Sequence, residues 1–256
     1  MAEGLSIACF VAHPDDETVF FGGTLALLAH RGVAVHVVSA TRGEGGELGE
    51  PPVCDRSELG QVRENEMRCA VEVLGARSLS FLGYLDPEMK SGEEFLAFAD
   101  RPEQVAERLA ALLSDHAVEA VVTHGSTGEY GHPAHRLAHE VARLAVRQIP
   151  GGPALYGFSA SFPAHPRPRL SNPQDQADLV LDVRSVWEHK VAAARCHVTQ
   201  GPSFVRRLSR ERGYPVPLEE ALMPLESLHL FLPGSADPDP LAAWIRENLG
   251  ELLVQP

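Results

Sequence analysis

Cysteine and aromatic residues are scarce in this sequence. Its 256 residues include 4 cysteines, and Phe, Trp and Tyr together make up 6% of the chain. Cys9, Cys54, Cys69 and Cys196 form no CxxC pair, which argues against a disulfide scaffold and against a zinc cluster held by thiolates. Cys9 and Cys69 lie in apolar stretches, so we expect them simply to pack. This cysteine usage favours a reducing, cytoplasmic location.

Positive charge and long apolar segments are also lacking. The chain has 22 Lys and Arg against 35 Asp and Glu, a net charge of −13, which repels phosphate backbones and anionic membranes. The N-terminal stretch MAEGLSIACFVAH has no basic segment, and its apolar run ends at His13, too early to cross a bilayer. We therefore expect neither a nucleic-acid partner nor a membrane partner.

Short strand-like runs alternate with amphipathic helical stretches. We predict strands at Leu5–Ala12, Val33–Ala40, Ser78–Leu82, Val118–His124 and Ala154–Ser159. We predict helices at Thr18–Arg31, Ser57–Leu74, Pro102–Asp115, Pro133–Arg147 and Arg184–His197, and a closing helix within Asp239–Leu253. This alternation indicates an α/β fold, a Rossmann-like three-layer α/β/α arrangement with a mostly parallel sheet. We expect residues 1–256 to form a single domain.

Three stretches rich in proline or glycine are predicted to be loops. They are Thr41–Pro52, Phe162–Pro173 and Gly201–Pro217. Long loops in a compact α/β domain are often functional lids, and the alternative is plain surface decoration.

A polar cluster follows the first predicted strand. It reads Ala12-His13-Pro14-Asp15-Asp16-Glu17, and in open α/β sheets ligands bind outside the carboxyl ends of the strands. A His and an Asp three residues apart on one tight turn can converge on a cation, while the adjacent Asp15 points elsewhere.

A second cluster, Gly131-His132-Pro133-Ala134-His135, follows the fourth predicted strand and opens a helix, with Pro133 at the first helical position. This places both histidines near the sheet edge that carries His13. Two imidazoles, one carboxylate and a water make a catalytic zinc site with an open position, and the same set can hold ferrous iron. The alternative is that His132 only caps the helix and that His135 is a partly buried structural residue.

These clusters resemble the motifs of the LmbE-like, PIG-L family of metal-dependent N-acetylglucosamine deacetylases. The matching motifs are AHPDDE at 12–17, TRGEGG at 41–46, Arg63 with Glu66, Leu74-Gly75, Tyr84-Leu85-Asp86, the run from Tyr130 to His135, and Lys190 with the run from His197 to Gln200. They cover nearly the whole chain in family order. The two histidine motifs together are specific, whereas each of the others alone is weak.

The resemblance implies a role for each matching residue. It implies metal ligation by His13, Asp16 and His135, a general base at Asp15, and an oxyanion-stabilising or amine-protonating imidazole at His132. The metal is expected to be zinc, with Fe(II) or another divalent ion as alternatives. Tyr130 matches a mobile tyrosine that can reach the reaction intermediate, or it packs in its glycine-flanked loop.

Arg63 and Asp86 match residues that bind substrate in the family. The alternatives are a surface ion pair between Arg63 and Glu66 and a turn-forming role for Asp86 before Pro87.

Further matching residues are expected only to support the site: Glu44, Lys190, His197 and Gln200.

One position departs from the family pattern. The family usually reads HPDH, whereas this chain has Ala134 in place of the aspartate. That carboxylate is expected to orient the first histidine, so the protonation state of His132 is open, with Glu129 or Glu140 as replacement partners.

The remaining histidines carry no motif, and we expect structural or surface roles for His30, His36, His116, His165 and His229. His124 and His139 lie near the second cluster and could support it.

The resemblance implies an enzyme that hydrolyses the N-acetyl group of an N-acetylglucosaminyl conjugate and releases acetate. The Tyr-x-Asp-x-x-Met stretch at Tyr84–Met89 suggests a small thiol precursor, an N-acetylglucosaminyl inositol or malate. Relatives often self-associate, so a homo-oligomer is an open alternative. The rivals are an amidase for a larger thiol-sugar conjugate, a non-catalytic sugar-binding protein, and, on poorer motif matches, a nucleotide-binding module or a serine hydrolase.

Overall fold

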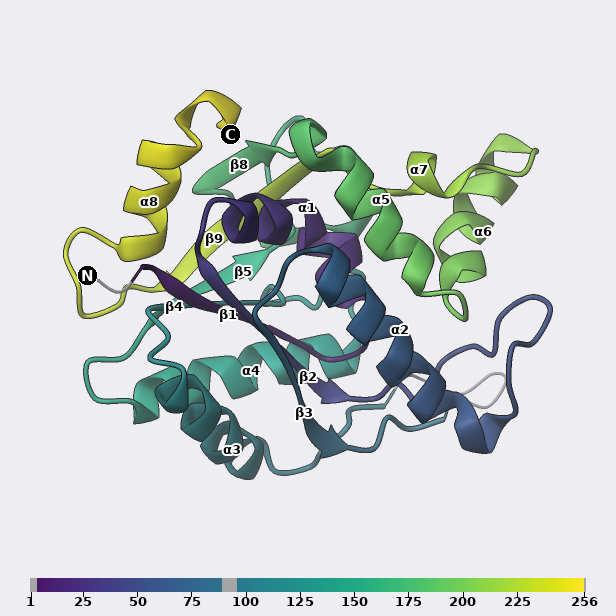
Figure 1. Ribbon diagram of the computed structural model, residues 1–256, viewed down its shortest axis with the longest axis horizontal. Coiled ribbons are helices and arrows are strands. Elements are labelled where there is room, and N and C mark those ends of the chain that lie inside the picture. Colours follow the sequence, from purple (N-terminus) through teal and green to yellow (C-terminus); the bar gives the residue numbers. More distant parts are fainter. Residues whose placement is uncertain (1–3, 89–95, 256) are drawn as a thin grey trace.

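A twisted, mostly parallel sheet forms the centre of the molecule (Figure 1). The computed structural model describes residues 4–88 and 96–255, so Met89 of the predicted Tyr84–Met89 motif lies outside the described residues. Within these ranges one sheet has 7 strands in the order β3-β2-β1-β4-β5-β9-β8. The strands are β1 (Ser6–Val11), β2 (Ala34–Thr41), β3 (Ser78–Tyr84), β4 (Ala120–Thr123), β5 (Ala154–Phe158), β8 (Leu179–Asp182) and β9 (Leu225–Leu232).

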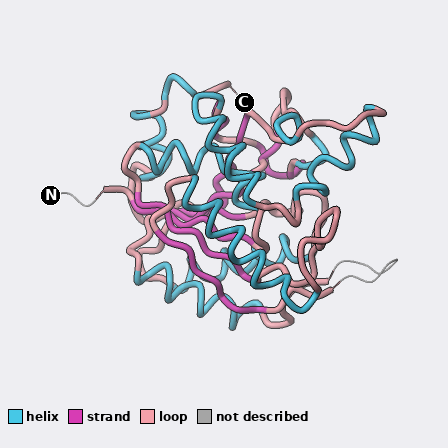
Figure 2. The backbone as a smooth tube through the Cα atoms, turned by 45° about the vertical axis from the view of Figure 1, so that its right-hand side comes forward, coloured by secondary structure: helices cyan, strands magenta, loops and turns pink. Residues whose placement is uncertain are grey.

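Helices cover both faces of this sheet, as Figure 2 shows. They are α1 (Asp16–His30), α2 (Leu59–Val73), α3 (Pro102–Asp115), α4 (Pro133–Gln148), α5 (Trp187–Cys196), α6 (Gly201–Arg212), α7 (Leu218–Ala221) and α8 (Pro240–Asn248). Side chains alternate along β1: Ile7, Cys9 and Val11 pack toward α1 and α2, whereas Ala8 and Phe10 pack toward α3 and α4. The predicted three-layer α/β/α fold is therefore confirmed. Among the described residues, no helix is both long enough and apolar enough to cross a membrane.

The structure adds strands that the sequence analysis missed. β9 pairs with β5 in the antiparallel direction, and β8 pairs with β9 in the same way, so both extend one edge of the parallel sheet. A second, two-stranded sheet joins β6 (Ala160–Ser161) to β7 (Asn172–Gln176) within the predicted loop Phe162–Pro173 and its flanks. These strands were missed because they pair in the antiparallel direction or in the small second sheet, without the helical crossovers that mark βαβ units.

The prediction that Gly201–Pro217 forms a loop is wrong. Residues Gly201–Arg212 form helix α6, with Pro202 in its first turn and Gly213 at its end in the left-handed conformation, at φ 76°. Proline is tolerated at the start of a helix and glycine favours its end, so the residues that suggested a loop mark the two helix boundaries instead. The predicted closing helix is confirmed as α8, where the Asp239 side chain accepts a hydrogen bond from the backbone N–H of Ala242 at 2.8 Å.

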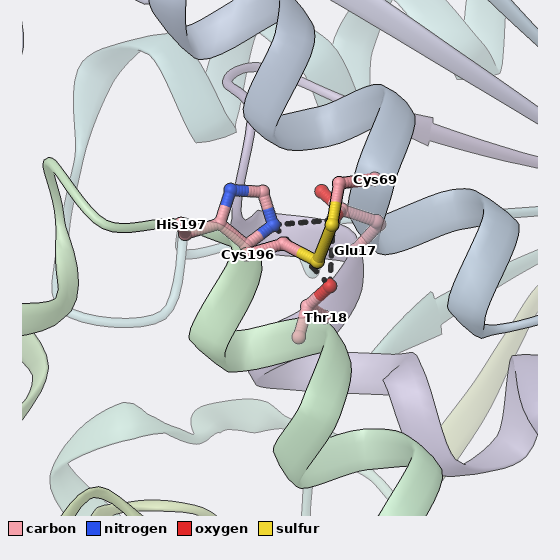
Figure 3. Close-up of a disulfide and its surroundings, with 5 residues drawn as sticks. All are labelled: Glu17, Thr18, Cys69, Cys196 and His197. Atoms are coloured by element: carbon pink, nitrogen blue, oxygen red, sulfur yellow. Dashed lines mark hydrogen bonds and ion pairs between the residues drawn. A yellow bond between two sulfur atoms is a disulfide. The ribbon is translucent and has the colours of Figure 1, made fainter.

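A disulfide between Cys69 and Cys196 contradicts the expectation that Cys69 only packs (Figure 3). Cys69 lies on the exposed side of α2 and Cys196 at the end of α5, with their Cα atoms 5.8 Å apart. The pairing could not be read from spacing because 127 positions separate the two cysteines and only the packing of α2 against α5 brings them together. Cys9 is free and buried as expected, and Cys54 is also free.

We predict that Cys196→Ser lowers the free energy of unfolding. The bond closes a long loop, and disulfides of this kind stabilise by about 2–4 kcal/mol, mainly by restricting the unfolded chain. Denaturant unfolding without reductant should show this loss, and the difference should disappear in dithiothreitol. Cys54→Ser is the matched control and should unfold like the wild type. Four reactive thiols in the unreduced, denatured wild type would contradict the bond.

Candidate functional site

Two turns meet where the strand order of the sheet reverses. β1 lies between β2 and β4, so the turns that follow β1 and β4 leave the sheet side by side. The first turn carries His13 to Asp16 and leads into α1, and the second leads into α4 through His132 and Pro133. The two predicted clusters therefore share one crevice.

His13, Asp16 and His135 converge in this crevice. One ligand atom of each lies within 4.8 Å of the other two. Asp16 Oδ2 is 3.4 Å from Nδ1 of His13, and Asp16 Oδ1 is 3.3 Å from Nε2 of His135. That Nε2 atom is buried and has no hydrogen-bond partner among the residues described. Two imidazoles and a carboxylate around an unpartnered buried nitrogen fit a divalent cation.

Asp15 lies beside these three residues, on the turn before α1. Its backbone has φ 114° and ψ −30°, a region that residues with side chains rarely occupy and that often marks functional sites. Burial raises the pKa of the Asp15 carboxyl to about 7, against the opposing effect of the nearby Arg63 guanidinium. Asp15 is thus held next to the candidate ligands by a strained turn.

Arg63 is a buried residue, so the alternative of a surface ion pair with Glu66 is wrong. Its side chain is 3% exposed, and Nη2 is 3.2 Å from Asp15 Oδ2. The guanidinium also donates to the carbonyl oxygens of Pro14, at 2.5 Å, and Gly43, at 2.8 Å. A Cβ atom at Gly43 would lie 2.2 Å from Nη1, and φ there is 68°, so the position requires glycine. Arg63 therefore ties the Asp15 turn to the loop after β2.

His132 caps helix α4. Its Nδ1 accepts a hydrogen bond from the backbone N–H of Ala134 at 3.2 Å. Burial lowers the pKa of His132 to about 3, and the neighbouring His135 and His13 act in the same direction. The ring stacks on His135 with 4.5 Å between centroids. The capping role was foreseen as an alternative, whereas His135 is completely buried rather than partly buried.

Neither proposed replacement for the missing aspartate takes its place beside His132 in the hydrogen bonds observed. Glu129 Oε2 lies 2.9 Å from His124 Nδ1 and 2.7 Å from His135 Nδ1. Glu140 instead accepts two hydrogen bonds from Arg143, one turn along α4. The carboxylate of Glu129 therefore serves His135, the third candidate ligand, and the motif-free His124.

Tyr130 and Asp86 both reach the crevice. The Tyr130 side chain is half exposed, and its ring meets those of His132 and His135 edge-on at 5.7 and 5.4 Å. Asp86 Oδ1 lies 3.3 Å from Nε2 of His13. Asp86 thus contacts a candidate metal ligand directly, in addition to lining the cavity.

The residues that were expected to support the site do not all lie at the cavity. Gln200 lines the cavity and donates to the carbonyl oxygen of Glu47 at 2.8 Å. Glu44 accepts a hydrogen bond from the backbone N–H of Asp86 at 3.1 Å. His197 is completely buried and does not line the cavity; its Nε2 is 3.0 Å from Glu17 Oε1 (Figure 3).

Lys190 lies away from the cavity, in the packing layer between α5, α1 and β9. Its buried Nζ donates to Glu226 Oε1 at 2.6 Å and to the carbonyl oxygen of Met223 at 2.9 Å. Glu226 also accepts from the backbone of Gly23 and Thr24 in α1. Lys190 therefore supports the helix that carries Asp16 rather than the site itself.

The motif-free histidines mostly contact other groups of the scaffold. His30 meets His189 edge-on, and His36 stacks on His116. His229 lies near the Gln176 carbonyl, and His165 accepts from the backbone of Arg167. His124 is the exception, because it is stacked against His135 at 4.0 Å between centroids. His139 contacts the carbonyl oxygen of His124.

A cavity of about 1150 Å³ opens from the crevice. One end holds His13, Asp15 and His132, and Gly45, Gly46 and Glu47 of the predicted loop Thr41–Pro52 form part of its wall. The far wall comes from residues 166–170 and, on α6, from Phe204, Arg207 and Leu208. These residues fall in the two other stretches predicted as loops, Phe162–Pro173 and Gly201–Pro217, so all three stretches line the cavity.

Comparison with known proteins agrees with this geometry. The family model described as PIG-L, GlcNAc-PI de-N-acetylase, matches residues 8–146, which include both histidine clusters. The 1D-myo-inositol 2-acetamido-2-deoxy-alpha-D-glucopyranoside deacetylase of Mycolicibacterium vanbaalenii is 33% identical, with 95% of this chain and 96% of the relative covered. A protein of the same name from Saccharopolyspora erythraea is 32% identical over 79% of this chain and 80% of its own.

Solved structures share the fold. The N,N'-diacetylchitobiose deacetylase of Pyrococcus horikoshii has a TM-score of 0.65 at 21% identity, covering 90% of this chain and 85% of its own. GalB, the 4-carboxy-2-hydroxymuconate hydratase of Pseudomonas putida, has a TM-score of 0.64 at 25% identity, covering 91% and 98%. Since a deacetylase and a hydratase share this fold, the fold alone does not assign the reaction.

We predict that the metal-free protein binds one divalent ion per chain at His13, Asp16 and His135. His135→Ala should remove this binding, because it deletes the ligand nitrogen in the buried end of the crevice. Calorimetric titration of chelator-treated protein with zinc measures the stoichiometry. His139→Ala is the matched control, since it removes a nearby histidine of the same helix that is outside the ligand group. Wild-type zinc binding by His135→Ala would exclude this ligand set.

Proposed function

The chain belongs to the PIG-L family of GlcNAc-PI de-N-acetylases, and from this premise we propose that it hydrolyses the N-acetyl group of an N-acetylglucosaminyl inositol. The products are acetate and the free amine of the sugar. The observation that carries the proposal is the convergence of His13, Asp16 and His135 with Asp15 beside them. The relatives' substrate name supports the choice of aglycone.

His13, Asp16 and His135 are the residues that would hold the metal, zinc by preference and ferrous iron as the alternative. When bound, the metal supplies Lewis acidity for the amide carbonyl and for the attacking water. This assignment explains the buried Nε2 of His135. As a metal ligand, the atom would have the partner that no hydrogen bond among the described residues supplies.

Asp15 is the proposed general base. Its carboxylate accepts the proton of the attacking water and passes it to the departing amine nitrogen, and Arg63 holds it in place through Oδ2. Because Arg63 also binds the backbone of Pro14 and Gly43, the base is fixed relative to two loops at once. A base fixed in this way needs little reorganisation before proton transfer.

His132 is the proposed donor to the developing oxyanion. Its Nδ1 accepts from the backbone N–H of Ala134, so the neutral ring carries its proton on Nε2 and can donate a hydrogen bond from there. This role needs no aspartate in the place of Ala134. Tyr130, which meets the His132 ring at the cavity mouth, is proposed to contact the same oxygen.

The sugar is proposed to lie against Asp86, with the aglycone directed toward α6. Asp86 lines the cavity next to His13. Arg63 lines the same cavity, so it is proposed to contact the sugar hydroxyls as well as the base. The far wall, with Phe204 and Arg207, leaves room for an inositol or a larger group. A cytoplasmic location and a homo-oligomer stay predictions, and the Cys69–Cys196 disulfide does not favour a reducing compartment.

We predict that Asp15→Asn abolishes most turnover while metal binding is kept. Removing a general base typically lowers kcat by about 10²–10⁴-fold. Acetate release from N-acetylglucosaminyl inositol, the malate conjugate and a larger thiol-sugar amide, each with metal content determined, measures the effect and ranks the aglycones. Glu140→Gln, on α4 and paired with Arg143, is the control. A metal-loaded wild type that binds these sugars without releasing acetate would favour the non-catalytic reading.

We predict that Arg63→Lys lowers kcat by about 100-fold, because small displacements of a catalytic group can cost that much. A lysine has one ammonium group and cannot satisfy Asp15 and the carbonyl oxygens of Pro14 and Gly43 together. Steady-state kinetics of acetate release separates this loss from a change in KM. Arg68→Lys, on the exposed side of the same helix, is the control. If Arg63→Lys raised KM alone, Arg63 would serve sugar binding rather than the base.

A further inference from the structure

Glu129 is a buried carboxylate between β4 and α4 that faces four N–H groups. Oε1 accepts hydrogen bonds from the backbone of Gly125 and from Asn172 Nδ2, both at 3.1 Å. Oε2 lies 2.9 Å from His124 Nδ1 and 2.7 Å from His135 Nδ1. An ionised carboxylate can only accept, so both imidazoles must carry a proton on Nδ1.

The partners of Asn172 fix this arrangement. Asn172 Oδ1 accepts from the backbone N–H groups of Thr127 and Glu129, and its Nδ2 faces the Phe158 carbonyl as well as Glu129. Because the donors and acceptors around the amide differ, only one orientation of the amide satisfies them. A Cβ atom at Gly125 would lie 2.2 Å from Asn172, so the packing there is tight.

The hydrogen bond at Nε2 of His124 gives independent evidence that the proton of this ring lies on Nδ1. The backbone N–H of Ala12 donates to His124 Nε2 at 3.1 Å, so Nε2 carries no proton. Ala12 immediately precedes His13, and both lie in the turn that follows β1. His124 thus connects Glu129 to the turn that carries two of the candidate ligands.

The proton on Nδ1 of His135 determines which nitrogen of the ring presents a lone pair to the crevice. With its proton on Nδ1, the Nε2 lone pair points into the crevice, 3.3 Å from Asp16 Oδ1. Two electron-rich atoms at this distance, one of them buried without a hydrogen-bond partner among the described residues, are favourable only with a metal cation beside them or a second proton on the ring.

We propose that Glu129 locks His124 and His135 in the Nδ1–H tautomer and thereby prepares Nε2 of His135 for metal binding. Glu129 is a positioning residue, acting through two imidazoles at once. The inference rests on the metal ligation in the proposed function and adds a residue that the family motifs did not mark. A carboxylate of this kind also raises the basicity of a ligating histidine.

Glu129→Gln tests the lock with almost no change in shape. If the amide nitrogen takes the place of Oε2, it faces two N–H groups, and at least one imidazole must move its proton to Nε2. If the amide nitrogen takes the place of Oε1, it faces the N–H groups of Gly125 and Asn172 instead. Either orientation breaks two of the four hydrogen bonds.

Asp175→Asn is the matched control. Asp175 is a buried carboxylate that holds the same loop, accepting from the backbone of Ser126 at 2.7 Å and from its hydroxyl at 2.5 Å. It makes no hydrogen bond to an imidazole among those observed in the described residues. A merely structural role of Glu129 would give both variants the same effect.

The experiment combines ring-nitrogen NMR of the metal-free protein with a Co²⁺ titration followed by visible absorption. We expect Nδ1–H tautomers at His124 and His135 in the wild type and in Asp175→Asn. In Glu129→Gln we expect Co²⁺ binding weaker by about 10–100-fold, with a switched ring where the amide nitrogen faces the imidazoles. An Nε2–H tautomer at His135 in the wild type overturns the proposal, even if the Glu129→Gln variant does not fold. Equal Co²⁺ affinities of the two variants also overturn it. Correct tautomers in a wild type that binds no Co²⁺ would contradict the proposed metal function but support the lock.

Discussion

The burial of one carboxylate, that of Asp16, sets the conditions for the rest of the site. Burial alone would raise the pKa of this carboxyl, so its charge depends on the backbone N–H of His13, which donates to Oδ2 at 2.9 Å, and on the cation that the proposed function places beside it. The carboxylate also begins helix α1, where the positive end of the helix dipole favours it. A buried anion that must stay charged needs cationic or hydrogen-bonding neighbours, and the crevice supplies imidazoles rather than lysine or arginine next to it.

This constraint explains why the two turns must be held so firmly. Asp16 comes from the turn after β1 and His135 from the helix after β4, so their distance depends on the pairing of the two strands. The Arg63 guanidinium ties the first turn to the loop after β2, and Glu129 ties the second to His124, which contacts Ala12. Each tie is buried and uses several hydrogen bonds, so loss of one partner leaves other polar groups unsatisfied.

The parts predicted well from the sequence are those with strong local signals. The strands β1, β2 and β4 are apolar runs that end in polar clusters, and parallel strands bring those ends to one edge, so the meeting of His13 with His135 followed directly. The parts that were missed depend on long-range packing. Neither the Cys69–Cys196 bond nor the contact of Glu129 with two histidines has a spacing signal, because each partner is chosen by how helices and loops pack. Helix α6 was missed for a different reason, since its proline and glycine lie at its ends.

The two ends of the cavity differ in how strongly the sequence marks them. The end of the cavity that is proposed to react is built from short turns at strand ends, where one residue out of place would move a proposed metal ligand or the proposed base. The far wall is built from α6 and residues 166–170, which pair mainly through exposed groups such as Arg207 and Arg169 with Glu211. Exposed ion pairs contribute little stability, so these segments can change with little cost to the fold. In the proposed function, selectivity for the aglycone therefore rests on α6 and residues 166–170, while the hydrolytic chemistry rests on the turns that follow β1 and β4.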